Sequence, residues 1–211
     1  MTSSAPQTKN QKRDLTQGSI MGHVLRMSVP MAIGIGAIII TAIYWLFGFL
    51  RMGTTGLTAQ AIGSGDKPET SALLVRGIII GLVAGLVLII VQVPIFLGAL
   101  QLSPASMEVE SLAQKYLQIR VYSAPAAIAL FGITGWLIAK EKTREVLLLQ
   151  LALNGINITL DLVFVLNLGW GVEGVAIATL IAEWSGLIFG LWLAREGFNN
   201  GYWKNWIQIF D

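Results

Sequence analysis

The chain contains no cysteine among its 211 residues and a single histidine, His23. The absence of cysteine excludes a disulfide framework, a thiolate metal site and a cysteine nucleophile. There is no HExxH pattern, and the carboxylates do not follow a recognisable metal-ligand spacing. We therefore expect no metal site and no cofactor, and an intramembrane enzyme is the weakest of the functions considered.

Charge is also scarce. Charged residues make up 12% of the chain and hydrophobic residues 55%, whereas soluble domains carry roughly 25% charged residues. The mean hydropathy is +0.69. These values predict an integral membrane protein. The net charge of +2 does not indicate a nucleic-acid partner, since the basic residues lie mostly at the edges of apolar stretches.

Five long stretches of low charge predict an all-α integral membrane protein, a bundle of about five transmembrane helices within residues 27–198. The polar segment 1–26 is expected to be retained and cytoplasmic, and the aromatic tail 199–211 to lie at the membrane interface. The expected spans are 28–50, 77–100, 119–139, 146–168 and 172–194. These spans predict a multi-pass membrane protein, which we expect in a plasma membrane.

Loop charges give a conflict in orientation. The basic loop 140–145 predicts a cytoplasmic location, and counting spans backwards makes segment 51–76 cytoplasmic as well. The basic N-terminus prefers the same side, yet only the uncharged run 27–50 separates it from 51–76. Two crossings need about 40 residues. Either this run is re-entrant or interfacial, or the N-terminus is outside, or about one span is missing, and we favour the missing span.

One carboxylate, Asp161, lies inside the predicted span 146–168 and is its only charged residue. At about 100° per residue, Gln150, Asn154, Asn157 and Asp161 fall within about 60° of one another. An acid near the bilayer centre costs about 2.5–3.5 kcal/mol on insertion scales. This polar face therefore predicts a site for a proton, a small cation or a polar substrate.

The depth of each residue predicts partners on the next helix. Asp161 lies about 6 Å beyond the midplane, at the level of Thr179, and Asn157 lies at the level of Glu183. Burial favours the protonated form of a carboxylate, and the same oxygens can coordinate Na⁺. The alternative is that these groups only join helices by hydrogen bonds, which applies most readily to Gln150 and Asn154.

Four segments carry a family pattern: LTQGSIMGHVLRMSVPMAI (15–33), FGFLRMGTTGLTAQAIGSGD (47–66), QIRVYSAPAAIALFGITGWL (118–137) and NGINITLDLVFVLNLGWGVEGVAIATLIAEW (154–184). Their most specific parts are the motif at 51–60 and the asparagine and aspartate at 157 and 161. Together these segments resemble the multidrug and toxic compound extrusion (MATE) transporters, and most closely the branch named for the DNA-damage-inducible protein DinF.

The resemblance implies an antiporter that couples H⁺ or Na⁺ entry to export of drugs or toxic organic compounds, which are often cationic. It implies two six-helix lobes around a central cavity, with a cation or proton site at Asp161, Asn157 and Thr179. Gln150, Asn154 and Glu183 are possible cavity-lining residues.

Two departures from the family pattern stand out. The chain ends after the equivalent of the sixth helix, so we expect an N-terminal half that a C-terminal lobe or a second copy would complete. An internal deletion is expected near Ile40–Thr41, because no acidic residue occurs between Asp14 and Asp66 where the family's first helix normally carries one. There are two alternatives to an exporter. The chain could be a non-transporting fragment or half-transporter module that needs a partner lobe, or it could be a lipid or polysaccharide flippase.

Overall fold

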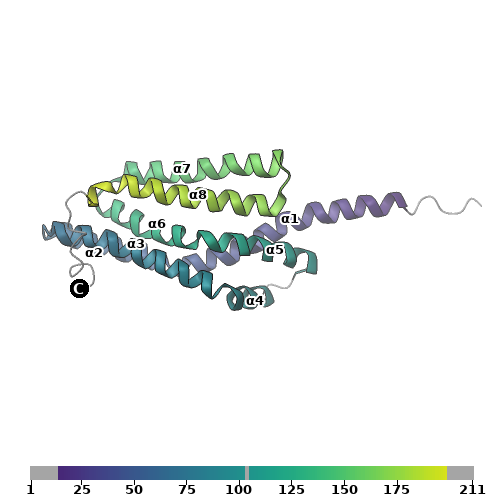
Figure 1. The fold of residues 1–211 in the computed structure, drawn as a ribbon, viewed down its shortest axis with the longest axis horizontal. Helices are drawn as coiled ribbons and strands as arrows, with labels where there is room; N and C mark the ends of the chain where they lie inside the picture. The colour runs from purple at the N-terminus through teal and green to yellow at the C-terminus, as the bar shows by residue number, and fades with distance from the viewer. Residues whose placement is uncertain (1–13, 103–104, 199–211) are drawn as a thin grey trace, which may run out of the picture.

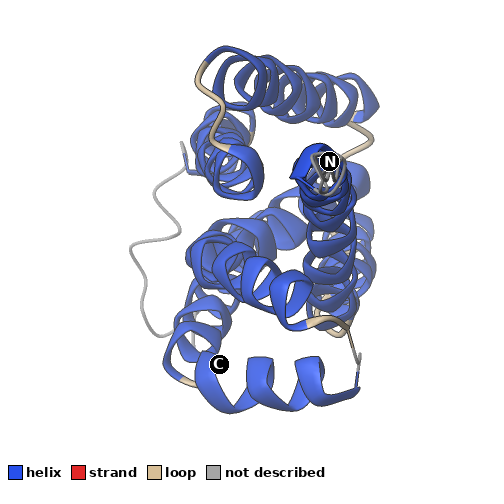
Figure 2. Ribbon diagram, turned by 90° about the vertical axis from the view of Figure 1, so that its right-hand side faces the viewer, coloured by secondary structure: helices blue, strands red, loops and turns tan. Residues whose placement is uncertain are grey.

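The computed structural model describes residues 14–102 and 105–198, with side chains described from Met27 onward. All regular structure in these residues is helical (Figures 1 and 2). The helices are α1 (Asp14–Trp45), α2 (Gly48–Gly63), α3 (Lys67–Ile90), α4 (Gln92–Leu102), α5 (Met107–Arg120), α6 (Ala124–Ala139), α7 (Thr143–Asp161) and α8 (Gly171–Leu193), with short 3₁₀ or π segments η1 (Val121–Ser123), η2 (Leu162–Asn167) and η3 (Arg195–Phe198).

Five helical passages are long and apolar enough to cross a membrane, judged by length and composition over the described residues. They confirm the predicted all-α bundle of about five spans. The passages are Met27–Gly63, Lys67–Ile90, Met107–Ala139, Thr143–Asn167 and Gly171–Leu193. The predicted interfacial tail, 199–211, lies outside the described residues.

Three of the predicted boundaries differ from the structure. The second span begins at Lys67 rather than residue 77, because Asp66 caps α3 by accepting a hydrogen bond from the Glu69 backbone N–H at 3.0 Å. It ends at Ile90, so 91–100 belong to the separate helix α4. The third span begins at Met107 rather than residue 119, since Ser106 caps α5 through a 3.4 Å bond from Val109 N–H.

The first span also differs, and it bears on orientation. Helices α1 and α2 follow each other through a two-residue turn at Leu46–Phe47 and make one passage from end to end of the bundle (Figure 1). The start of α1 therefore lies at the end opposite the α6–α7 turn. A cytoplasmic N-terminal segment together with a cytoplasmic loop 140–145 would require one further crossing. Residues 1–13 lie outside the described part of the chain.

Helix α6 is the centre of the bundle and is buried along most of its length. Helix α3 packs directly on it through Gly77, Gly81 and Gly85, all buried. A Cβ atom placed on Gly81 would lie 2.4 Å from the Ala129 Cα of α6. Small residues at this spacing allow two membrane helices to approach closely, so α3 and α6 form a rigid pair.

At one end of the bundle, η3 is fastened to the α6–α7 turn by ion pairs. Glu196 accepts hydrogen bonds from Lys142 and, at 3.1 Å, from Lys140. Gly197, the next residue of η3, packs against Leu74 of α3 and Trp136 of α6. The segment that follows α8 is thereby held against α3 and α6.

We expect this fastening to weaken in acid. Hydrogen bonds from Lys142 and Lys140 lower the pKa of the Glu196 carboxyl. Its stabilisation is therefore present above the ordinary pKa of glutamate and is lost as the pH falls through the lowered value in the folded protein. Because the pair is half-exposed, Glu196→Gln should cost at most about 1 kcal/mol at pH 7.

The measurement is the difference in unfolding free energy between wild type and Glu196→Gln across the acidic range. It should shrink toward zero as the pH falls. Glu110→Gln, which removes an exposed carboxylate on α5, serves as the control. A difference that stays constant with pH would contradict the ion-pair assignment.

Candidate functional site

A polar cavity of about 290 Å³ lies between α1, α2, α6, α7 and α8. Its walls combine amide, hydroxyl and charged side chains with apolar ones, as is typical of small-molecule sites. The lining residues are Tyr44, Arg51, Ala127, Leu130, Phe131, Thr134, Gln150, Leu153, Asn154, Asn157, Thr179, Ala182 and Glu183. Five of the six residues proposed from the sequence are among them, and Asp161 is the one that is not.

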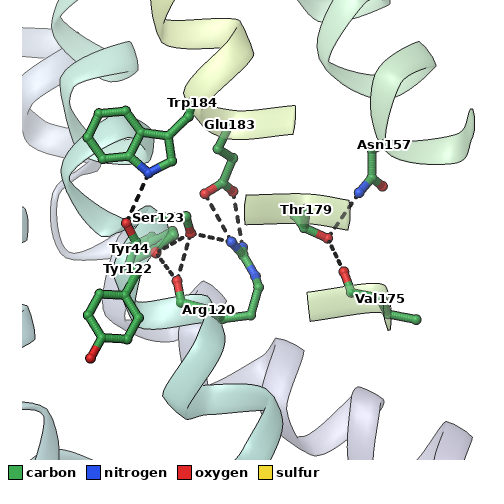
Figure 3. A network of polar contacts seen from close by, with 9 residues as sticks. All are labelled: Tyr44, Arg120, Tyr122, Ser123, Asn157, Val175, Thr179, Glu183 and Trp184. Carbon is green, nitrogen blue, oxygen red and sulfur yellow. Dashed lines mark hydrogen bonds and ion pairs between the residues drawn. The ribbon is translucent and has the colours of Figure 1, made fainter. Parts of the chain in front are cut away.

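The strongest polar contact at the cavity is a buried ion pair between α5 and α8. Arg120 donates through both terminal nitrogens to the two carboxylate oxygens of Glu183, each at 3.0 Å (Figure 3). The side chains are 7% and 17% exposed. A bidentate pair of this kind fixes both position and orientation. The predicted partner of Glu183 was Asn157; the structure gives it Arg120 instead, because α5 lies against α8 on the opposite side from α7.

Two further groups from other helices complete the surroundings of this ion pair. The Arg120 guanidinium donates to the Ser123 hydroxyl, and that hydroxyl lies 3.3 Å from the Tyr44 hydroxyl of α1. The guanidinium carbon lies 6.0 Å from the centre of the Tyr44 ring. The pair therefore joins α1, α5 and α8 at one point beside the cavity.

The depth argument paired Asp161 with Thr179, and the structure corrects this by one helical turn. Asn157 donates from Nδ2 to the Thr179 hydroxyl at 3.0 Å (Figure 3). That hydroxyl donates in turn to the backbone oxygen of Val175 at 2.9 Å. The error arises because depth was counted from predicted span ends. The observed passage begins at Thr143 rather than residue 146, which places Asn157 rather than Asp161 nearest to the depth of Thr179.

Asp161 itself is the last residue of α7, at the junction with η2. It lies four residues beyond Asn157 and therefore on the same helix face. One of its carboxylate oxygens is buried, and no donor among the described residues reaches it. A buried carboxylate oxygen without a hydrogen-bond donor is rare in folded proteins. The π segment that follows Asp161 is a second unusual feature, since π turns are frequent at functional sites.

The remaining predicted residues lie nearer the start of α7. Gln150 and Asn154 are exposed at the cavity, and the Asn154 amide donates to the Gln150 backbone oxygen at 2.9 Å. Sequence reasoning did not single out Arg120, Ser123 or Tyr44. Little in the sequence indicated Arg120, because it is the second residue of the predicted span 119–139, at an edge where basic residues are common. The observed passage begins at Met107 and so places Arg120 near its middle, where a charge is costly.

The MatE family profile matches residues 18–163. DNA damage-inducible protein F of Escherichia coli (strain K12) is 35% identical over 182 residues, covering 86% of this chain and 40% of that protein. The chain therefore spans about two-fifths of the length of this curated relative.

Two solved structures of a multidrug resistance MATE family transporter of the MOP superfamily are similar in fold. The inward-facing conformation has a TM-score of 0.73 at 26% identity, covering 78% of this chain and 38% of that one. The outward-facing conformation has a TM-score of 0.71 at 26% identity, covering 77% and 36%. With the family profile matching well over half of its length, the chain is a multi-pass membrane protein that belongs to the MatE family, in the branch of the DNA damage-inducible protein F.

Proposed function

We propose that this chain forms the cation-binding lobe of a secondary transporter that couples entry of H⁺ or Na⁺ to export of drugs or toxic organic compounds across a bacterial inner membrane. The observation that carries the proposal is a buried oxygen of Asp161 that no donor among the described residues reaches, one helical turn beyond the Asn157–Thr179 contact. Membership of the family, and the likeness to multidrug resistance transporters, support export as the direction of transport.

The geometry supports a site for a small cation. Asn157 uses its amide nitrogen to donate to Thr179, which leaves its Oδ1 as an acceptor on the face that also carries Asp161. A carboxylate and an amide oxygen are ligands that Na⁺ can use, and the carboxylate alone can take a proton. Thr179 is oriented by its own bond to Val175, so it holds the Asn157 amide in one orientation.

The chain resembles both an inward-facing and an outward-facing MATE family transporter structure, which fits movement of the lobe as a unit. The chain matches the inward-facing and outward-facing forms with nearly equal TM-scores, 0.73 and 0.71, which is expected when the lobe keeps its internal structure while it rocks. Alternating access requires two surfaces around a central site. A second lobe, in the same polypeptide or as a partner chain or second copy, would supply the other surface.

Asp161→Asn should abolish gradient-driven transport, because the amide keeps the shape of the side chain but can neither take up a proton nor neutralise Na⁺. The measurement is uptake or release of a fluorescent organic substrate by proteoliposomes under an imposed H⁺ or Na⁺ gradient. Glu145→Gln, at the start of the same helix, is the matched control and should leave transport unchanged. Transport that survives in Asp161→Asn would rule out the assigned role.

A further inference from the structure

Arg51 lies on α2, in the specific motif at 51–60, and its backbone is held firmly against α6. A Cβ atom on Gly135 of α6 would lie 2.5 Å from the Arg51 carbonyl oxygen. The Thr55 hydroxyl bridges the two helices, at 2.8 Å from that oxygen and 3.1 Å from the Gly135 oxygen. The contact with Gly135 fixes the Cα position of Arg51 at the wall of the cavity. Gly135 lies four residues, about 6 Å, before the end of α6 at Ala139.

The charges that line the cavity do not cancel. Glu183 is neutralised by two hydrogen bonds from Arg120. Arg51 is the other charged residue of the lining, and in the part of the chain that the structure describes no carboxylate lies within ion-pair distance of it. Asp161 is outside the lining. Arg51 is exposed at the edge of the cavity. With the Arg120–Glu183 pair intact, it is the one charged lining residue without an opposite charge from the described residues within ion-pair distance.

The rest of the wall suits an organic body rather than a free inorganic ion. Leu130, Phe131 and Leu153 form its apolar part, and the exposed amides of Gln150 and Asn154 form a polar strip on α7. A guanidinium at one side of such a cavity favours a planar anionic group such as carboxylate, sulfonate or phosphate.

From this juxtaposition we propose that the cavity binds small amphiphilic organic anions, with the anionic group on Arg51 and the apolar body against α6 and α7. The inference rests on the proposed transport function and narrows its substrate class. It departs from the expectation of cationic substrates, because an organic cation would meet the unbalanced charge of Arg51 and would have to displace Arg120 to reach Glu183.

The test is equilibrium binding to the purified 211-residue chain in an uncharged detergent, without any ion gradient. The two ligands are 2-naphthalenesulfonate and 2-naphthyltrimethylammonium, which share one ring system and differ in the sign of the charge. Binding is followed by isothermal titration calorimetry. We expect the sulfonate to bind at least about tenfold more tightly, and Arg51→Gln to remove about tenfold of that affinity.

Two variants separate a specific contact from general surface potential. Arg144→Gln removes an exposed positive charge at the start of α7, outside the cavity, and should leave both affinities unchanged. Arg51→Lys keeps the charge and should retain most of the preference for the sulfonate. Tryptophan fluorescence reports whether each variant is folded.

Equal or tighter binding of the ammonium ligand to wild type would overturn the proposal, whatever the variants do. So would an equal loss of sulfonate affinity in Arg51→Gln and Arg144→Gln, since Arg51 would then act only through the overall potential. Because no gradient is present, this assay is independent of coupling at Asp161. A transport failure in Asp161→Asn therefore bears on the proposed function, and the loss of anion preference bears on the substrate class.

Discussion

Arg120→Ala is expected to lower the free energy of unfolding by about 3–5 kcal/mol, the usual cost of leaving one member of a buried ion pair without its partner. Glu183 would lose two 3.0 Å hydrogen bonds in a position where water reaches only 17% of its side chain. Ser123 would lose its donor, and Tyr44 the cation beside its ring. The loss should therefore loosen the junction of α1, α5 and α8 together.

Titration with SDS in mixed micelles, followed by tryptophan fluorescence, measures this free energy. Glu183→Ala should cost a similar amount, whereas the double substitution Arg120→Met with Glu183→Met should recover most of it, because no buried charge remains. The control pair is Lys115–Glu173, 3.5 Å apart and about half-exposed, for which Lys115→Ala should cost less than about 1 kcal/mol. Equal effects at the two pairs would show that the Arg120–Glu183 contact is not buried in the protein.

Gly85→Ala is the second substitution with a large expected effect. The new Cβ atom would lie 2.2 Å from the Pro125 backbone nitrogen and 2.3 Å from its Cα. Backbone atoms cannot rotate away as a side chain can, so α3 and α6 would have to separate. We expect a loss of about 3 kcal/mol or more, the upper part of the range for overpacking, although alanine is the better helix former by about 1 kcal/mol.

Gly98→Ala on α4 is the matched control, because no atom lies within 4 Å of the position of its Cβ. It should be neutral or stabilising in the same SDS titration. If Gly85→Ala were as stable as Gly98→Ala, the direct backbone contact between α3 and α6 would be excluded. Gly81→Ala, which would contact Ala129 at 2.4 Å, should behave like Gly85→Ala.

The number of membrane-spanning passages could be predicted from sequence because hydropathy is a local property. A run of about 20 apolar residues must form a helix in a bilayer, since its backbone groups have no other partners there. The ends were harder to predict. The cap at Asp66 depends on a single backbone conformation. The break at Val91 has a local cause in Pro94, whose ring clashes with the carbonyl four residues earlier, at Ile90, where α3 ends, but hydropathy alone does not mark it because the run 77–100 stays low in charge.

The candidate site was predicted in part. The polar face of α7 follows from the spacing of its residues alone, and Gln150, Asn154 and Asn157 do line one cavity with Thr179 and Glu183. The partners did not follow from spacing. Asn157 rather than Asp161 bonds to Thr179, because the relative translation of two helices depends on how their side chains interlock.

The sequence by itself determined that this protein is a helical membrane protein with a polar face around one intramembrane acid, because charge cost and helical periodicity act along the chain. Only the tertiary structure decided that Glu183 is neutralised by Arg120 and that Arg51 lines the cavity. Within the described part of the chain it also left one oxygen of Asp161 without a donor and Arg51 without a carboxylate at ion-pair distance. Each of these depends on which side chains from distant helices come within about 3 Å of one another. Such distances are set by helix packing and are not encoded in any local pattern.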